Sequence, residues 1–301
     1  MVYLLRDGNL LPDDPAAAGP RLCIAPPTKL AEAKTLLGKN APLLERLLES
    51  GVARHESRDQ FDYISFALPD LGNLLAPAEQ FSVCLTHDLL IFITDGSPGV
   101  DAVFETIRSE EYRVTGLGQV LYLFLDRLTS NDYLTLEAIE QEISELEEAL
   151  ITDEKSSCIR EIVSLRRRLM ALKRYYEQLF TICEGIEQNE NGLCEKGMLR
   201  YFRLLSQRIN RLENHVLNLR DYVTQVREAY QAQVDINLNQ IMKVFTVITA
   251  IFLPLTLIAG WYGMNLAMPE YHWPYAYPVV ICVSAAVVGL FILFFKKKHW
   301  F

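Results

Sequence analysis

The sequence is poor in the residue spacings that build common metal and catalytic centres. Its six cysteines and five histidines are scattered, with no CxxC, HExxH or HxH spacing. This excludes a zinc finger or a thioredoxin-like centre, and we expect the thiols to act as small buried hydrophobes. We find no glycine-rich phosphate loop and no nucleophile elbow. The sequence therefore predicts neither an enzyme nor a resident cofactor.

Positive charge is also scarce. The 301 residues carry 29 basic and 38 acidic side chains, a net charge of −9, which argues against a nucleic-acid binder. The first residues lack a basic stretch followed by an apolar run, so we expect no signal peptide. Half of the residues are hydrophobic, which excludes disorder, and the length suggests about two domains.

The C-terminal fifth lacks basic residues altogether until its end. No Lys or Arg occurs from Val244 to Phe295, and Glu270 is the one acid there. Segments 244–261 and 278–296 are each long enough to cross a hydrocarbon core of about 30 Å as helices. Pro278 suits the first turn of the second helix, whereas Pro254 lies inside the first and frees a carbonyl there. The sequence thus predicts two transmembrane helices in a lipid bilayer.

The charges that flank these two segments predict their orientation. Lys243 precedes the first span. Lys296 ends the second span, and Lys297 and Lys298 begin the basic tail 297–301, whereas the loop 262–277 has no Lys or Arg. The positive-inside rule then places both termini in the cytoplasm and the loop outside the cytoplasmic membrane. Aromatic residues around the loop fit an interfacial belt.

The part before the membrane divides by pattern into three segments. Residues 1–130 read as a cytosolic α/β domain, with a helix over 28–50 and strands over 61–68, 81–86 and 89–94. Residues 131–190 predict an antiparallel helical hairpin with a polar turn at 152–157, because apolar residues recur at steps of three and four. Residues 191–243 predict a stalk helix. The fold class is an α+β cytosolic domain, a long helical hairpin and stalk helix, and two C-terminal transmembrane helices.

The first helix of the hairpin is strongly acidic. Residues 131–154 contain no base and nine acids, namely Asp132, Glu137, Glu140, Glu142, Glu145, Glu147, Glu148, Asp153 and Glu154. One interpretation is a solvated helix face. The other is an electrostatic basin that concentrates cations near a pore mouth.

One uninterrupted helix is predicted from about Lys196 to Trp261. Its heptad stripe of apolar residues, packing against neighbours, is Ile209, Leu212, Val216, Leu219, Val223, Val226 and Tyr230. A second stripe, polar and then mixed, consists of Glu228, Asp235, Asn239, Met242, Thr246, Thr249, Leu253, Thr256 and Gly260. Polar groups at membrane depth normally face a bundle interior or a wet cavity, which indicates a pore lining. The rival interpretation is threonine bonding back to its own helix.

The residues around the first span resemble CorA-type divalent metal-ion transporters. The resemblance rests on Tyr262-Gly263-Met264-Asn265, on the stretches 239–244 and 252–256, on Met268-Pro269-Glu270, on Tyr277-Pro278 and on the closing Lys296-Lys297-Lys298-His299-Trp300. It is close over about 220–301. Upstream it extends only to the outline of an α/β domain, an acidic hairpin and a long stalk.

The resemblance implies a funnel-shaped homopentamer that carries Mg²⁺, and often Co²⁺ or Ni²⁺. Five copies of the first span would line the axis, as expected because two helices per chain cannot enclose a pore. Gly263, Met264 and Asn265 would form the selectivity filter, with Asn265 holding the metal through its hydration waters and Glu270 adding charge outside. The pore would be lined by Asn239, Met242, Phe245, Thr246, Thr249, Leu253, Thr256 and Gly260, with Glu228 and Asp235 as cytosolic pore acids.

The chemistry of Mg²⁺ agrees with this filter. Mg²⁺ dehydrates reluctantly and keeps its waters, so a ring of amide oxygens can accept hydrogen bonds from those waters. Met242 and Leu253 could form apolar constrictions. Gly263 is expected to supply the backbone dihedrals needed where the helix ends.

Two positions depart from the family pattern, and two alternatives stay open. Leu204 occupies the place of an acid that the resemblance implies for a regulatory cation site between subunits, and Phe245 is bulkier than the expected aliphatic residue. The first alternative is a ZntB-like zinc transporter, possibly proton-coupled, which Leu204 and His272 favour. The second is a non-conducting, membrane-anchored coiled-coil scaffold, which leaves the polar stripe unexplained.

Overall fold

The computed structural model describes residues 2–6, 9–13, 17–27, 31–38, 41–49, 54–58, 60–94, 105, 114–151, 158–265, 268–298 and 300. The chain forms two compact units, Met1–Arg227 and Glu228–Phe301. The boundary falls inside one long helix. The segments 1–130 and 131–190 therefore share the first unit, and both apolar C-terminal segments belong to the second.

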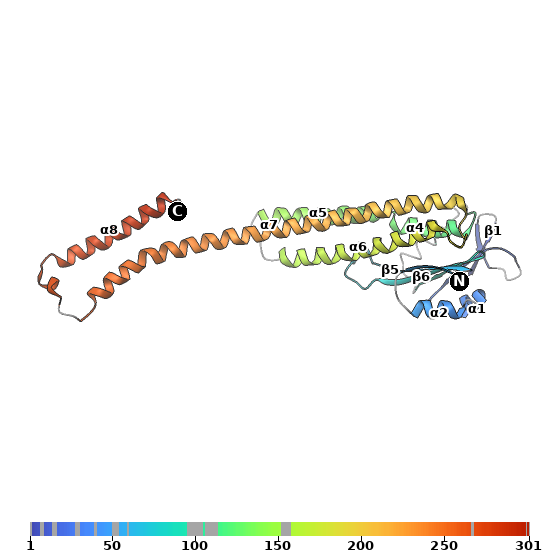
Figure 1. Ribbon diagram of the computed structural model, residues 1–301, viewed down its shortest axis with the longest axis horizontal. Coiled ribbons are helices and arrows are strands. Elements are labelled where there is room, and N and C mark those ends of the chain that lie inside the picture. Colours follow the sequence, from blue (N-terminus) through green and yellow to red (C-terminus); the bar gives the residue numbers. More distant parts are fainter. Residues whose placement is uncertain are drawn as a thin grey trace. The chain divides into compact units, whose positions relative to one another are not determined.

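A mixed β-sheet forms the base of the first unit. In the described ranges its strand order is β2-β1-β3-β7-β6-β5-β4, and Figure 1 labels β1, β5 and β6 of this sheet. Strands β3 and β7 pair in parallel, and the other pairings are antiparallel. The strands are β1 (Val2–Arg6), β2 (Asn9–Pro12), β3 (Arg21–Ala25), β4 (Arg54–Arg58), β5 (Phe61–Leu68), β6 (Glu79–Leu85) and β7 (Leu89–Ile93).

Three of these strands were predictable, and the structure confirms them. The strand predicted over 61–68 is β5 with the same bounds, and those predicted over 81–86 and 89–94 are β6 and β7 with ends shifted by one or two residues. All five residues of β7 are buried. A strand that is covered on both faces reads as a continuous apolar run, which is why the pattern was visible.

The single helix predicted over 28–50 is wrong. The structure has two shorter helices there, α1 (Ala31–Leu37) and α2 (Ala41–Glu49). Gly38 follows the last residue of α1 with a φ of +57°, a left-handed conformation that glycine adopts without a steric penalty and that ends a helix. Residues 28–30, 39–40 and 50 lie outside the described ranges.

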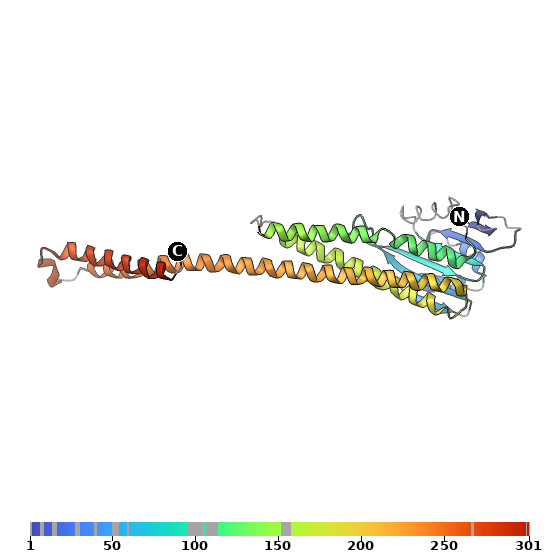
Figure 2. The same cartoon turned by 90° about the horizontal axis from the view of Figure 1, so that it is seen from above.

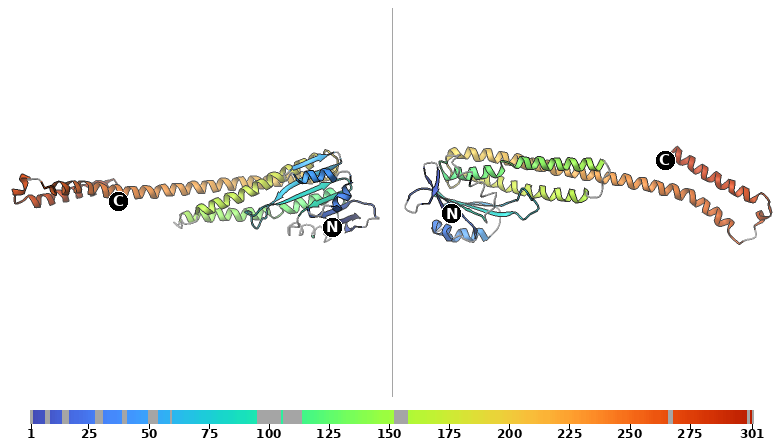
Figure 3. Two further views of the ribbon diagram at one scale, coloured as in Figure 1. Left: turned by 90° about the horizontal axis from the view of Figure 1, so that it is seen from below. Right: turned by 180° about the vertical axis from the view of Figure 1, so that it is seen from behind.

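Each face of the sheet is covered by helices. On one face, α1 and α2 pack through Ala33, Leu37, Leu44 and Leu47 against Tyr63 and its strand neighbours (Figure 3, left). On the other face, α4 (Leu117–Thr129) lies over the strands (Figure 2). Its Phe124 ring stacks on Phe81 at 4.9 Å between centroids and lies 4.9 Å from the Phe92 ring. These two apolar layers hold the sheet between them.

The predicted helical hairpin is confirmed. Its helices are α5 (Asp132–Ile151) and α6 (Cys158–Gln188), and residues 152–157, where the polar turn was predicted, lie outside the described ranges. Every position of the two predicted apolar stripes is buried: Leu136, Ile139, Ile143, Leu146 and Leu150 on α5, and Ile162, Leu165, Leu169, Leu172, Tyr176 and Leu179 on α6. The long helix α7 (Lys196–Tyr262) buries its apolar stripe from Ile209 to Val226 in the same unit.

Gly185 of α6 lies against His55 of the sheet. A Cβ atom added to Gly185 would lie 2.7 Å from Cγ of His55 on β4, and the His55 side chain is only 11% exposed. We expect Gly185→Ala to destabilise the first unit by about 1–3 kcal/mol, the usual cost of overpacking a core. Gly197→Ala in α7 is the matched control, because nothing lies within 4 Å of its added Cβ. Thermal unfolding of both variants checks this, and equal melting temperatures would contradict the contact.

The second unit contains the remainder of α7, a short 3₁₀ helix η3 (Pro269–His272) and α8 (Ala276–Lys297). Both α7 and α8 contain segments long and apolar enough to cross a membrane. Helix α7 continues through Pro254. Helix α8 begins two residues before the predicted segment 278–296, so Pro278 lies in its first turn as expected.

Candidate functional site

The polar stripe predicted to line a pore lies on one helix. All its residues from Glu228 to Gly260 belong to the part of α7 in the second unit, and all are exposed in the single chain. Its apolar side chains Met242 and Leu253 are 63% and 69% exposed, and the neighbouring Phe245 is 63% exposed. Nothing lies within 4 Å of a Cβ added to Gly260. This face of α7 is therefore uncovered by its own chain.

One face of the α7 span is less exposed than the polar stripe, and the other helix of the second unit, α8, runs beside α7 (Figure 1). The buried and half-buried positions of the α7 span include Val247, Ile251, Pro254 and Ile258, at steps of three and four. The matching positions on α8 are Ala276, Val280, Ser284, Val287, Phe291 and Phe295. At 100° per residue the centre of this less exposed face of α7 lies about 140° from the centre of the polar stripe. The sequence reasoning missed this face, although its apolar spacing was a usable signal.

Phe245 lies at the edge of the polar stripe. It is about 60° from the centre of the stripe on the helical wheel, whereas Met242, Thr249 and Leu253 lie close to the centre. Its exposed ring therefore borders the stripe.

The three threonines of the stripe each donate a hydrogen bond to their own helix. The hydroxyls of Thr246, Thr249 and Thr256 donate to the carbonyls of Met242, Phe245 and Phe252 at 2.7, 2.8 and 2.8 Å. The rival interpretation is thus correct for the hydroxyl protons. It does not exclude a pore lining, because each hydroxyl oxygen keeps acceptor lone pairs on an exposed face.

Gly263 is needed for a different reason from the one expected. Its φ lies outside the left-handed range, so the dihedral argument is wrong. A Cβ atom at Gly263 would lie 2.9 Å from the carbonyl oxygen of Ala259, and the Gly263 amide donates to that same oxygen at 2.9 Å. The last turn of α7 therefore leaves little room for a side chain at Gly263, because its backbone lies close to the Ala259 carbonyl four residues earlier. Met264 and Asn265 follow directly and are exposed.

The loop after Asn265 is partly helical. Residues 266 and 267 lie outside the described ranges, and η3 then carries Glu270 and His272, both exposed. The amide of Trp273 donates to the carbonyl of Glu270 at 3.0 Å. The rings of Trp273 and Tyr275 lie 6.3 Å apart and are exposed, as an interfacial aromatic belt would be. The loop thus presents one carboxylate and one imidazole near the end of α7.

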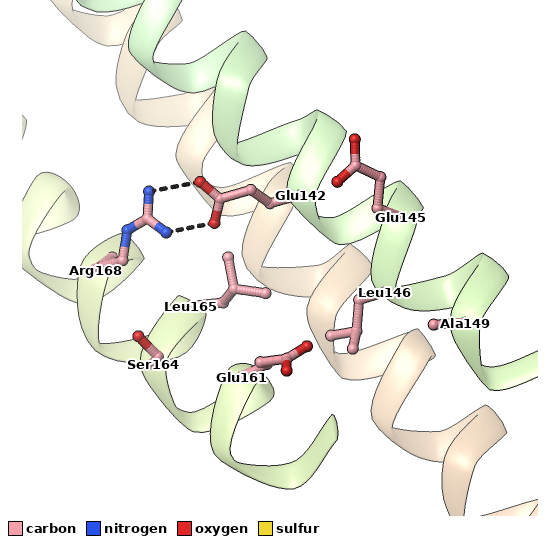
Figure 4. A pocket seen from close by; sticks show the side chains of 8 residues that line it. All are labelled: Glu142, Glu145, Leu146, Ala149, Glu161, Ser164, Leu165 and Arg168. Carbon is pink, nitrogen blue, oxygen red and sulfur yellow. Dashed lines mark hydrogen bonds and ion pairs between the residues drawn. The ribbon is translucent and has the colours of Figure 1, made fainter. Parts of the chain in front are cut away.

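The acidic hairpin is less negative than its sequence suggests. Arg168 binds both carboxylate oxygens of Glu142 at 2.5 and 3.1 Å, beside a pocket of about 310 Å³ between α5 and α6 (Figure 4). His215 lies 3.4 Å from Glu140, and the hydroxyl of Tyr222 donates to Glu147. Asp153 and Glu154 lie outside the described ranges. The remaining acids resemble a solvated helix face more than a single basin.

Asp132 does not belong to that solvated face. It is 0% exposed, and neither carboxylate oxygen has a hydrogen-bond partner within the described part of the chain. Burial raises the pKa of Asp132 from 3.8 to about 7, and the nearby hydroxyl of Tyr176 offsets this only in part. Burial and the adjacent carboxylate also raise the pKa of Tyr176. The sequence could not reveal this, because an acid at the start of a helix ordinarily points to water.

Leu204 and its neighbours lie on the first unit's part of α7. Leu204 is 50% exposed and Tyr201 is 48% exposed, and the Tyr201 ring lies 5.4 Å from that of Tyr122. One turn further along, Arg208 pairs with Asp126 at 2.7 Å. Within the described ranges, no group of three or more His, Cys, Asp and Glu side chains could hold a metal ion.

Comparison with known proteins gives one consistent family. The family model described as "CorA-like Mg2+ transporter protein" matches residues 38–297. The "Cobalt/magnesium transport protein CorA" of Thermotoga maritima is 32% identical over 227 residues, 74% of this chain. The match spans 65% of that relative's own length.

Two solved structures share the fold. The CorA magnesium transporter of Methanocaldococcus jannaschii has a TM-score of 0.83 at 21% identity, covering 100% of this chain and 99% of the other. The cytoplasmic domain of ZntB from Vibrio parahaemolyticus has a TM-score of 0.64 at 13% identity, covering 78% of this chain and 97% of that domain. At these identities the likeness concerns the fold.

Proposed function

The chain belongs to the CorA-like Mg²⁺ transporter family, and from this premise we propose that it carries Mg²⁺ across the cytoplasmic membrane. The observation that carries the proposal is the exposed polar stripe of α7, which lies away from the less exposed face of the span. In an oligomer, copies of this stripe would face one another around an aqueous path. Co²⁺ and Ni²⁺ also bind oxygen ligands, although less exclusively than Mg²⁺ does, and would follow the same path.

The path requires several copies of the chain. Two spanning helices cannot enclose a pore, and a closed ring of identical subunits is the usual solution. We infer a homopentamer in which five copies of α7 form the inner ring and five copies of α8 form the outer, lipid-facing ring. The division of α7 into a polar face and a less exposed face supports this arrangement.

The filter is formed by the residues at the end of α7. Asn265 offers an amide oxygen that accepts hydrogen bonds from the water shell of Mg²⁺, so the ion need not dehydrate. Gly263 lets the chain leave the helix close to its last carbonyls, and Met264 follows it. Glu270 adds negative charge nearby and raises the local cation concentration.

The inner half of the path is lined by groups of alternating character. Glu228, Asp235 and Asn239 would attract and solvate cations at the cytosolic end, and Met242 and Leu253 would form apolar constrictions that control conduction by dewetting. Thr246 and Thr249 lie between the constrictions and offer hydroxyl oxygens. Phe245 at the edge of the stripe would narrow the path beside Met242.

Thr256 provides a test of the lining. We expect Thr256→Val to reduce cation flux by roughly threefold to tenfold, because one acceptor oxygen per copy is replaced by a methyl group of the same size. Thr224→Val is the matched control, since the Thr224 hydroxyl makes the same backbone bond at 3.0 Å outside the spanning segment. Flux through both variants in proteoliposomes decides this. An unchanged flux in Thr256→Val would move Thr256 out of the path.

The orientation follows from the flanking charges. With Lys243 before the first span and Lys296, Lys297 and Lys298 at the end of the second, both termini are inferred to lie in the cytoplasm and the η3 loop outside. The lipid bilayer is then the surrounding partner of α8, and nucleic acid is not a partner.

A zinc transporter, with or without proton coupling, is the second candidate. Two observations favour it: the likeness in fold to the ZntB cytoplasmic domain, and the exposed imidazole of His272 beside Glu270. Imidazole suits Zn²⁺ better than Mg²⁺. We expect His272→Ala to leave Mg²⁺ flux unchanged and to lower Zn²⁺ flux if zinc is carried.

Reconstitution of the purified protein tests the proposed function. Vesicles that contain a Mg²⁺-sensitive dye should fill when Mg²⁺ is added outside under an inward-negative voltage, and protein-free vesicles should not. A protein that is correctly assembled and yet gives no flux above the protein-free level would favour the scaffold alternative.

A further inference from the structure

Helix α6 carries a second stripe that its own chain leaves uncovered. Ile159, Val163 and Met170 are 59%, 42% and 59% exposed, and with Arg166 they recur at steps of four, three and four. This is heptad spacing, distinct from the buried stripe that packs the hairpin. Three large apolar side chains in one exposed heptad stripe mark a surface for another helix.

Positive charge lies within this stripe, at Arg166, and along one side of it. Arg160, Arg166, Arg167 and Arg174 are exposed and form no ion pair with any residue that the structure describes. By contrast, Arg168 on the opposite side of α6 is held by Glu142 of the same chain. The uncovered face of α6 is therefore both apolar and basic.

The outer face of α5 has the complementary character. Leu134 is 65% exposed, and Glu137, Gln141, Glu145 and Glu148 are exposed along the same face. The spacing of these residues is three or four throughout, so they form a stripe of one apolar and four polar or acidic side chains. Gln141 donates a hydrogen bond to Glu145 at 3.0 Å.

We propose that α5 of a second copy of this chain docks on the α6 stripe. The proposal rests on the proposed function, because a path formed by α7 requires several copies around one axis. Such a contact joins two different faces, α5 of one copy and α6 of the next, which is the head-to-tail type that closes into a ring. Charge complementarity between the faces selects a second copy as the occupant.

The heights of the charges along the bundle agree with this contact. Helices α5 and α6 are antiparallel, and the Glu142–Arg168 pair marks residues at the same height. A rotation about an axis that runs along the bundle leaves height unchanged. Glu145 lies three residues after Glu142 on α5, and Arg166 lies two residues before Arg168 on α6. Because the helices are antiparallel, both steps run in the same direction along the bundle, so Glu145 of one copy is level with Arg166 of the next. In the opposite direction, Glu137 lies five residues before Glu142 and Arg174 lies six residues after Arg168, so Glu137 of one copy is level with Arg174 of the next.

The two kinds of side chain have different roles in the contact. Ile159, Val163 and Met170 leave water when the neighbouring helix covers them, which stabilises association. Exposed charge pairs contribute little to affinity but fix the partner and the register. The pairs of Glu137 with Arg174 and of Glu145 with Arg166 therefore determine which heights meet.

Cysteine cross-linking between two differently tagged full-length chains tests the proposal. The background is Cys282→Ser, since Cys282 is the exposed cysteine and the other five are buried. Chains with Glu145→Cys are co-expressed with Arg166→Cys, and chains with Glu137→Cys with Arg174→Cys. We expect disulfide-linked heterotypic dimers in both cases. The matched control pairs Glu137→Cys with Ile159→Cys, about 22 Å along α6 from Arg174, and should give at least tenfold less product.

Equal cross-linking in all three pairs, or none in any, would overturn the proposal. Charge exchange is the second measurement. Arg166→Glu with Arg174→Glu should lower the oligomer fraction at least fivefold in native mass analysis, and adding Glu137→Arg with Glu145→Arg should restore it. Cross-linking is measured without ion flux, so a failure of the proposed contact can be distinguished from a failure of the proposed function. A cross-linked ring without flux contradicts the function, and flux without these cross-links contradicts the contact.

Discussion

Replacing Asn265 with alanine should abolish selective Mg²⁺ flux while leaving the oligomer intact. A hydrogen bond between neutral groups, here an amide oxygen and a water of the Mg²⁺ shell, contributes about 0.5–1.5 kcal/mol, and a ring of copies loses one such acceptor from every subunit at once. We therefore expect a fall of more than about 100-fold in Mg²⁺ flux into proteoliposomes. The side chain is exposed after the last turn of α7, so its removal leaves no cavity in either unit.

The control for this prediction is Asn218→Ala. Asn218 is an exposed asparagine on the same helix, in the first unit and outside the proposed path. Its replacement should leave flux unchanged, and native mass analysis should give the same oligomer for both variants. Normal Mg²⁺ flux in Asn265→Ala, with an intact oligomer, would remove Asn265 from the filter.

Asp132→Asn should stabilise the first unit at alkaline pH and not at acidic pH. The folded-state pKa of Asp132 is raised from 3.8 to about 7, so folding favours the neutral carboxyl. The stability that the neutral form provides is fully present below pH 3.8 and is lost as the pH rises through about 7. Between pH 5 and pH 8 the parent chain should lose about 3 kcal/mol from this one group.

The amide of asparagine has the same shape and no charge, so the variant should not suffer this loss. For a unit of this size, about 3 kcal/mol corresponds to roughly 6–12 °C in melting temperature. Thermal unfolding followed by circular dichroism at pH 5 and pH 8 measures the difference. Glu184→Gln is the control, because Glu184 is an exposed carboxylate on α6, the helix that packs against α5. Parallel pH profiles for the parent and Asp132→Asn would contradict the buried, unpartnered carboxyl.

The features predictable from sequence are those set by the period of the apolar pattern. The stripes of α5, α6 and α7 are long and regular, and they are buried as expected. β5 was predictable because it is a bounded run of strand-forming residues. β4, with the sequence Arg-His-Glu-Ser-Arg, has no apolar alternation, and its pairing with β5 alone defines it. The break after α1 depends on one left-handed glycine, Gly38, within an otherwise helical pattern.

The candidate site divides in the same way. The polar stripe of α7 could be read from spacing, since each residue follows the last by three or four positions or by seven. The requirement for glycine at position 263 could not be read from spacing, because it arises from the short distance between the Gly263 backbone and the carbonyl oxygen of Ala259. The burial of Asp132 also depends on the packing of α5 against α6, which brings Tyr176 beside it. Sequence reasoning located the elements and misjudged individual environments within them.

The most direct test of the central claim is ion selectivity in proteoliposomes. Mg²⁺ and Zn²⁺ flux would be measured in the same vesicles, with and without a pH gradient, at a fixed membrane voltage. We expect Mg²⁺ flux that follows the voltage and does not change with the pH gradient. Zn²⁺ flux that follows the proton gradient, without Mg²⁺ flux, would contradict this expectation and make His272 and the acids Glu228 and Asp235 the next residues to replace.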